Sequence, residues 1–182
     1  MTDDEYNNLP PGFSMLGGLQ SIERLIKEIQ PKSVLEIGCF LGRTSVAICK
    51  SDPTLALTCV DSWNEQFIIP NMFEKFNITP ETMQSEFRRN TAEYNITPIC
   101  GNFLHHETQS QLENYDLTII DVHRRRKIML PVLSLAWAKT RICMSGAHYS
   151  NQYPIVQSVV NDFAKIISRP VHIDSVTWKI MK

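Results

Sequence analysis

Short apolar runs alternate along the chain with segments whose apolar residues recur every three to four positions. The short runs predict buried strands and the periodic segments predict amphipathic helices. The expected strands are 34–37, 55–61, 96–100, 116–121, 140–145, 171–173 and 176–180. The expected helices are 19–29, 43–50, 81–94, 107–114, 123–137 and 154–167. This alternation predicts an α/β protein with a mostly parallel sheet, closed by an antiparallel pair of strands.

The length of 182 residues suits one domain with a sizeable core. We assign residues 19–182 to that domain. Residues 1–18 are polar and then rich in Pro and Gly, and Leu9-Pro10-Pro11-Gly12 is a loop signal. This arm is either disordered or a lid over a site, and the sequence leaves both readings open.

The most informative stretch runs from Lys32 to Ser45, where an apolar run meets two glycines and the start of a helix. Gly38 permits a sharp turn and leaves room for a ligand beside the main chain. A strand–glycine–helix crossing of this kind is where open α/β sheets bind nucleotide-like ligands. The spacing is not the G-x-G-x-x-G that a pyrophosphate requires, and Glu36 precedes the first glycine. An anion there favours a cationic ligand with an amino-acid tail.

The pattern E-x-G-x-x-x-G, read here as Glu36-Ile37-Gly38-Cys39-Phe40-Leu41-Gly42, resembles class I S-adenosylmethionine (SAM) methyltransferases. It is most similar to small-molecule O-methyltransferases of the catechol, caffeoyl-CoA and macrocin types. The resemblance implies a Rossmann-like fold with a mostly parallel seven-stranded sheet, helices on both faces and a C-terminal antiparallel hairpin. It also implies SAM as the cofactor.

The resemblance implies that the cofactor contacts residues at the ends of successive strands. Asp61 follows the second strand, where an acid accepts hydrogen bonds from ribose hydroxyls. Trp63 either stacks on adenine or is a partly buried packing residue, and the aromatic-rich segment 64–80 either covers the site or packs beneath it. The expected cofactor contacts are Glu36, Gly38, Cys39, Phe40, Gly42, Thr44, Asp61, Ser62, Trp63, Asn102, Phe103 and Asp121.

The expected catalytic residues are Asp121, His123 and His148. The family pattern Y-D-x-x-x-I-D-G-x-H is similar to the stretch from Tyr115 to His123, which lacks its glycine and one residue. Asp121 would lie beside the sulfonium methyl, and His123 would be the base. The acid that completes a metal site in relatives is replaced near His148, so we expect no Mg²⁺ site. The three side chains form either a metal-free acid/base cluster or a transition-metal site.

The run from His123 to Lys127 concentrates four cations where a helix is expected to begin. Cations at a helix N-terminus oppose the helix dipole, so helix formation does not explain them. They either bind an anionic acceptor, with a carboxylate or phosphate, or form a solvated surface.

Composition and charge argue against some classes of binding partner. The net charge of −1 argues against a general nucleic-acid binder, and no apolar run is long enough to span a membrane. The acidic start, with Asp3, Asp4 and Glu5, does not resemble a signal peptide. Five scattered cysteines without a C-x-x-C pair are typical of reduced, buried thiols in a cytoplasmic protein. The sequence leaves open whether the protein is a homodimer.

Together these features predict a SAM-dependent methyltransferase that methylates a hydroxyl of a small molecule. One alternative is a SAM-binding protein that has lost catalysis and serves as an interaction or regulatory module. The altered turn at Val122-His123, the missing glycines before the fifth strand and the loss of the acid after it favour this alternative. A nicotinamide-dependent oxidoreductase is disfavoured because G-x-G-x-x-G is missing.

Overall fold

The computed structural model describes residues 1–63, 72–122 and 124–182. The strands are β1 (Ser33–Ile37), β2 (Ala56–Asp61), β3 (Ile96–Cys100), β4 (Tyr115–Ile120), β5 (Thr140–Gly146), β6 (His172–Asp174) and β7 (Thr177–Met181). The helices are α1 (Asp3–Asn7), α2 (Leu16–Ile29), α3 (Arg43–Ser51), α4 (Met72–Phe76), α5 (Met83–Thr91), α6 (His106–Gln109), α7 (Arg126–Lys139) and α8 (Pro154–Ile166).

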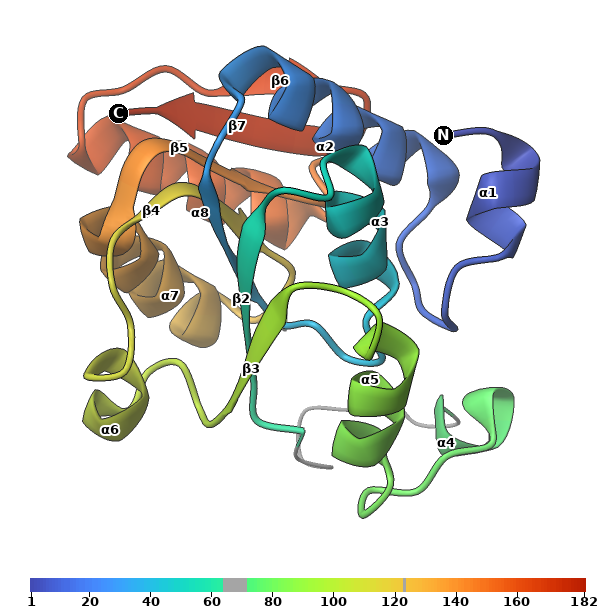
Figure 1. Ribbon diagram of the computed structural model, residues 1–182. Coiled ribbons are helices and arrows are strands. Elements are labelled where there is room, and N and C mark those ends of the chain that lie inside the picture. Colours follow the sequence, from blue (N-terminus) through green and yellow to red (C-terminus); the bar gives the residue numbers. More distant parts are fainter. Residues whose placement is uncertain (64–71, 123) are drawn as a thin grey trace.

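The strands form one seven-stranded sheet in the order β3-β2-β1-β4-β5-β7-β6 (Figure 1). The five strands from β3 to β5 pair in parallel, whereas β7 is antiparallel to both β5 and β6. This confirms the predicted mostly parallel sheet with its closing antiparallel pair. Strand β3 contains Pro98 and lies at the sheet edge, as a residue without a backbone N–H requires.

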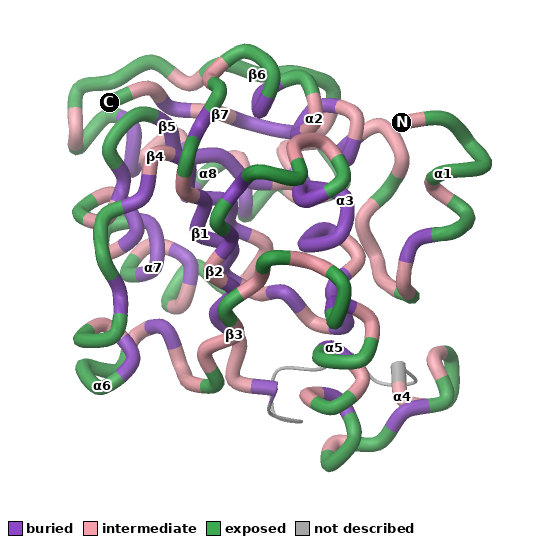
Figure 2. Tube along the Cα trace, in the orientation of Figure 1, coloured by how far each residue is buried: buried purple, intermediate pink, exposed green. Residues whose placement is uncertain are grey.

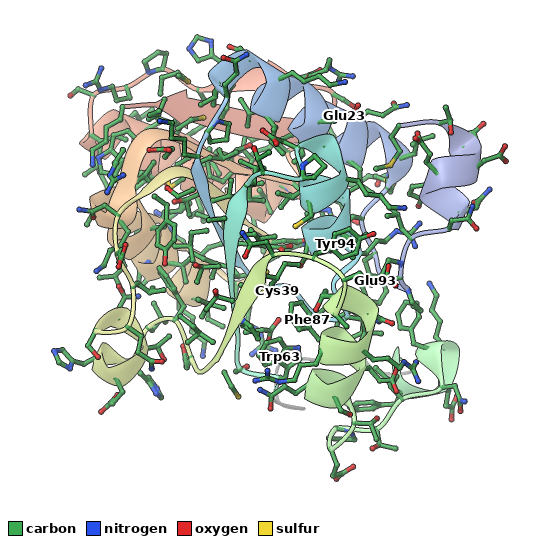
Figure 3. All side chains as sticks on the ribbon, in the orientation of Figure 1. Glu23, Cys39, Trp63, Phe87, Glu93 and Tyr94 are labelled. Atoms are coloured by element: carbon green, nitrogen blue, oxygen red, sulfur yellow. The ribbon has the colours of Figure 1, made fainter. Side chains whose placement is uncertain are left out.

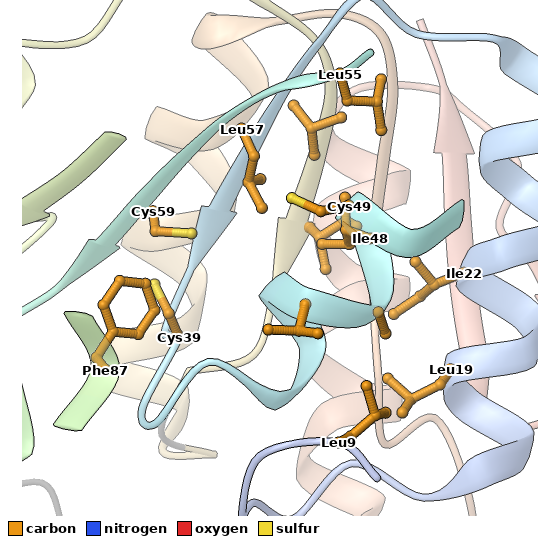
Figure 4. Close-up of a cluster of buried hydrophobic side chains, with 14 of the residues drawn as sticks. Leu9, Leu19, Ile22, Cys39, Ile48, Cys49, Leu55, Leu57, Cys59 and Phe87 are labelled. Carbon is orange, nitrogen blue, oxygen red and sulfur yellow. The ribbon is translucent and has the colours of Figure 1, made fainter. Parts of the chain in front are cut away.

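Helices cover both faces of the sheet. Helix α2 packs on α3 along one face, and α7 packs on α8 along the other. Each face has its own apolar cluster, and Figure 4 shows part of the cluster beneath α2 and α3. The central strands are therefore buried on both sides: Val34, Leu35 and Ile37 of β1 are at most 1% exposed. Figure 2 shows the same gradient, with buried residues gathered in the middle of the sheet.

Several predicted bounds need correction. Helix α2 begins at Leu16, because its apolar face extends one turn further than the strongest periodic residues. Helix α7 begins at Arg126, which leaves Arg124 in the preceding loop. Helices α5 and α6 are shorter than expected. Cys100 is exposed because it lies at the end of an edge strand, so only the other four cysteines are buried.

The strand order positions the site. From β1 the chain continues to β2 and β3 on one side of β1, and then crosses to β4 on its other side. The direction of the crossovers therefore reverses between the neighbouring strands β1 and β4. Such a reversal opens a crevice at the carboxyl ends of parallel strands, where α/β proteins bind their ligands. Backbone bonds still tie these ends together: Gly38 N donates to Val60 O at 2.9 Å, and Asp121 N donates to Ile37 O at 2.9 Å.

Candidate active site

A cavity of about 500 Å³ opens at this crevice. Its volume lies in the range of small-molecule sites. The ends of β1, β2 and β4 supply much of its wall, and further residues come from the N-terminal arm, from the loops after β3 and β5 and from helices α3, α5 and α7. The predicted site residues on the wall are Gly38, Cys39, Phe40, Thr44, Asp61, Ser62, Trp63, Asn102, Phe103, Asp121 and His148.

The turn after β1 has a left-handed backbone at both glycines, with φ of 88° at Gly38 and 91° at Gly42. A Cβ at Gly38 would lie 2.1 Å from Asp121 O, so this turn packs directly against the end of β4. A Cβ at Gly42 would lie 2.8 Å from Thr91 Cγ2. Gly42 is absent from the cavity wall and is needed for the packing of α3 on α5, in contrast to the cofactor contact expected for it.

Asp61 organises the neighbouring part of the wall. Its carboxylate accepts 2.9 Å hydrogen bonds from the backbone N–H groups of Phe40 and Trp63. Burial raises the pKa of the Asp61 carboxyl, and these N–H donors act in the opposite direction. The Trp63 indole donates to Phe40 O at 2.7 Å and packs on Phe87 (Figure 3). The side chains of Asp61 and Trp63 thus hold the main chain of the glycine turn in place.

Glu36 does not line the cavity. Its side chain is fully buried beneath the turn, where it accepts hydrogen bonds from Ser45 Oγ and, at 3.4 Å, from Cys59 Sγ. Burial raises its pKa to about 8, so the carboxyl is mostly protonated at neutral pH. The structure therefore corrects the expectation of an anion that faces a cationic ligand. Glu36 instead links β1 to α3, because its backbone alternation directs the side chain under the helix.

The loop after β3 contributes Asn102 and Phe103. Asn102 Oδ1 accepts from Leu104 N at 3.0 Å, which folds this loop into a tight turn at the cavity. Phe103 is 5% exposed and joins the apolar cluster beneath α7 and α8. Thr44 shares a 2.6 Å hydroxyl hydrogen bond with Ser14 of the N-terminal arm.

The opposite wall carries the candidate catalytic side chains. His148 Nε2 lies 3.2 Å from Asp121 Oδ1 and 3.0 Å from Arg124 Nη2. The Arg124 guanidinium also lies 4.1 Å from the centre of the Tyr153 ring. The structure thus brings together two of the three predicted catalytic residues. The third, His123, lies outside the described residues, as do residues 64–71 of the segment 64–80 that was expected to cover or underlie the site.

Sequence reasoning missed part of the wall. Gly12, Phe13 and Ser14 of the arm line the cavity, and Phe13 packs on Phe40. Arg43 fastens this arm by donating to Pro10 O at 2.9 Å and to Tyr6 O at 3.1 Å. The Pro/Gly-rich composition signalled a loop, but no local pattern indicates where a loop folds back.

The described residues bring together one group of potential metal ligands, formed by Glu36, Cys39 and Cys59. This group is buried beneath the glycine turn, and burial raises the pKa of both thiols and of the carboxyl. In the described part of the chain, Asp121 and His148 have no third ligand of this kind. None of the described helices is long and apolar enough to cross a membrane.

Several solved structures share the fold of this chain. A Staphylococcus aureus protein described as a caffeoyl-CoA O-methyltransferase has a TM-score of 0.70 and 19% identity, over 98% of this chain and 88% of that one. A Bacillus cereus O-methyltransferase in complex with S-adenosylhomocysteine (SAH) has a TM-score of 0.64 and 14% identity, over 98% and 87%. A Streptomyces achromogenes O-methyltransferase involved in tomaymycin synthesis, in complex with SAM, has a TM-score of 0.64 and 13% identity, over 98% and 85%.

No protein-family model and no curated protein sequence matches the chain. At these identities the likeness shows a shared fold. It confirms the Rossmann-like methyltransferase fold that the glycine-turn sequence implied.

Proposed function

We propose that this chain, which has the fold of SAM-dependent O-methyltransferases, transfers the methyl group of SAM to a hydroxyl of a small molecule. The observation that carries the proposal is the cavity at the reversal between β1 and β4. Its wall combines a main-chain turn after β1, an acid at the end of β2 and an acid–imidazole pair at the ends of β4 and β5. The chain's structural neighbours include proteins solved with SAM or SAH.

The wall residues fit such a cofactor. The main chain at Gly38 and Phe40 is held open to the cavity, as suits the amino-acid end of the ligand. Asp61 has acceptor capacity beyond its two backbone donors, as suits ribose hydroxyls. Ser62 and Asn102 offer polar groups on the same side. The cofactor, when bound, supplies an electrophilic methyl group.

The chain's own task is then to position the acceptor and remove its proton. His148 is the described group best suited to this, since its Nε2 faces Asp121, which stabilises an imidazolium at 3.2 Å. Apolar wall residues such as Phe13 and Ile128 exclude water around the acceptor. Alignment of the hydroxyl with the methyl group supplies much of the rate, because displacement needs little covalent help.

We propose that the acceptor is small and anionic, because the cavity is small and a cation, Arg124, lies on its wall. The residues 1–18 act as a lid in this proposal, supported by the wall position of Phe13. Four of the five cysteines are free and buried, which supports a cytoplasmic protein.

The test is calorimetric titration of the protein with SAH. We expect micromolar binding that weakens 10- to 100-fold in D61A, because both the ribose acceptor and the support of the Phe40 main chain are lost. D61N is the matched control, since its amide oxygen keeps one of the two acceptors and should lose less. Absence of SAH binding by the wild type would overturn the proposed function. SAH binding without turnover on any hydroxyl acceptor would instead indicate a cofactor-binding module.

A further inference from the structure

Arg124 differs from the other cations of its run in where it lies. Arg125 is exposed, and Arg126 pairs with Asp162 of α8 at 2.8 Å. Arg124 is half-buried and lines the cavity. The run that the sequence presented as one basic patch is therefore divided, and a single guanidinium of it reaches the site.

Arg124 forms no ion pair with a carboxylate of the described residues. Among the described residues, no carboxylate lies within 4 Å of its guanidinium, which contacts the Tyr153 ring and His148 Nε2. The other arginine of the wall, Arg43, donates from both Nη atoms to backbone carbonyls and holds the arm. A guanidinium has five N–H donors in a planar fork that matches carboxylate or phosphate oxygens. Arg124 has most of these donors to spare.

The contact with His148 has a chemical consequence. An arginine only donates, so the 3.0 Å contact between Arg124 Nη2 and His148 Nε2 is a hydrogen bond only while Nε2 carries no proton. The 3.2 Å contact between the same Nε2 and Asp121 Oδ1 is a hydrogen bond only when Nε2 is protonated. The two bonds are therefore alternatives. His148 Nδ1 is buried without a partner in the described structure, so Nε2 is the nitrogen that exchanges protons with the cavity.

We propose that Arg124 is the specificity-determining residue that binds a carboxylate or phosphate of the methyl acceptor, and that this binding draws it away from His148 Nε2. The inference rests on the proposed function. The freed Nε2 takes the proton of the acceptor hydroxyl, and the oxygen's electron pair forms the new bond to carbon. The methyl–sulfur bond breaks, and its electron pair returns to sulfur. Asp121 then holds the proton-bearing imidazolium until solvent removes the proton. A neutral acceptor does not bind Arg124. Arg124 then stays hydrogen-bonded to His148 Nε2, and the acceptor reacts slowly.

The experiment is nitrogen-15 NMR of the histidine side chains in SAH-loaded protein, combined with titration calorimetry. The probes are benzoate and phenyl phosphate, with benzamide as the neutral match of benzoate. H148N identifies the His148 signals by their disappearance. We expect at least one anion to bind and shift the Nε2 signal, and benzamide to do neither. Separate titrations with the two anions distinguish a carboxylate from a phosphate acceptor.

The matched variants are R124Q and R125Q, which remove the same charge from adjacent positions, only one of which lines the cavity. We expect R124Q to weaken anion binding at least tenfold and R125Q to change it less than threefold. Unchanged SAH binding and thermal unfolding show that R124Q is folded. R124K tests the planar fork of guanidinium donors. Lysine keeps the charge but lacks the fork, so we expect R124K to recover only part of the affinity for the anion.

Three results would overturn the inference. These are equal losses in R124Q and R125Q, equal binding of benzoate and benzamide, and SAH binding without binding of either anion. In all three cases the proposed methyl transfer from SAM stands, because SAH still binds, and only the anionic nature of the acceptor falls with the inference. Loss of SAH binding in the wild type is the separate result that overturns the proposed function itself.

Discussion

After β1 and β2 the polar side chains of the cavity wall bind main-chain groups, whereas after β4 and β5 they contact one another. Asp61 binds the backbone of Phe40, and a side chain at Gly38 would collide with the backbone of β4. On the other side, His148, Asp121 and Arg124 contact one another only through side-chain atoms. The first region is thus part of the folded core, and the second can change partners without unfolding it. This difference predicts different responses to substitution.

The largest effect is expected at Gly38. In G38A the new Cβ meets Asp121 O at 2.1 Å and the backbone stays at positive φ. We expect the free energy of unfolding to fall by about 4 kcal/mol, from overpacking and left-handed strain together. Urea unfolding measures this. The control is G18A in α2, where the nearest atom lies at 3.7 Å and helix propensity should stabilise the protein by up to about 1 kcal/mol. A loss below about 1 kcal/mol in G38A would show that the close packing of the glycine turn against the end of β4 contributes little to stability.

The second effect is the pH dependence of stability through Glu36. Burial raises its pKa from 4.5 to about 8, so the unfolded state loses this proton first as the pH rises. The contribution of the neutral carboxyl to stability is complete below about pH 4.5 and is lost as the pH rises toward 8. From pH 5 to pH 8 we expect a loss of about 3 kcal/mol, since one unit of pKa shift is worth about 1.4 kcal/mol.

The variant that isolates this group is E36Q, in which the amide replaces the protonated carboxyl. Urea unfolding at pH 5 and pH 8 should show that most of the wild-type difference is gone. E93Q, which removes an exposed carboxylate, is the matched control and should keep the wild-type profile. A pH profile of E36Q that parallels the wild type would mean that Glu36 is ionised in the folded protein.

The smallest effect on stability is expected at His148, which has φ of 66°. H148N suits this backbone, because asparagine tolerates the left-handed region. We expect unfolding to change by less than about 1 kcal/mol, while methyl transfer falls by about 10²- to 10⁴-fold, as is typical for loss of a general base. Turnover is measured as SAH release, with H172N in the exposed strand β6 as the control. A large loss of stability in H148N without a loss of turnover would show that His148 supports the fold and is not the base.

The sequence by itself determined the sheet, the strands that form it and the glycine turn. Val34, Leu35 and Ile37 form a short apolar run broken by one acid, Glu36, and such a run favours a strand covered on both faces. The positions of Gly38 and Asp61 on the cavity wall also followed, because the carboxyl ends of adjacent parallel strands lie together. These inferences depend on neighbouring residues and on pairing between strands, which local pattern encodes.

Only the tertiary structure decided which polar side chains face the cavity. Glu36 and Asp61 look alike in sequence as acids in or after strands, yet one lies under α3 and the other on the wall. Arg124 and His148 are 24 residues apart, and only the pairing of β4 with β5 brings their side chains within 3.0 Å. Phe13 reaches the site because Arg43 fastens the arm. Such contacts arise from the packing of distant segments, and no periodic pattern along the chain records them.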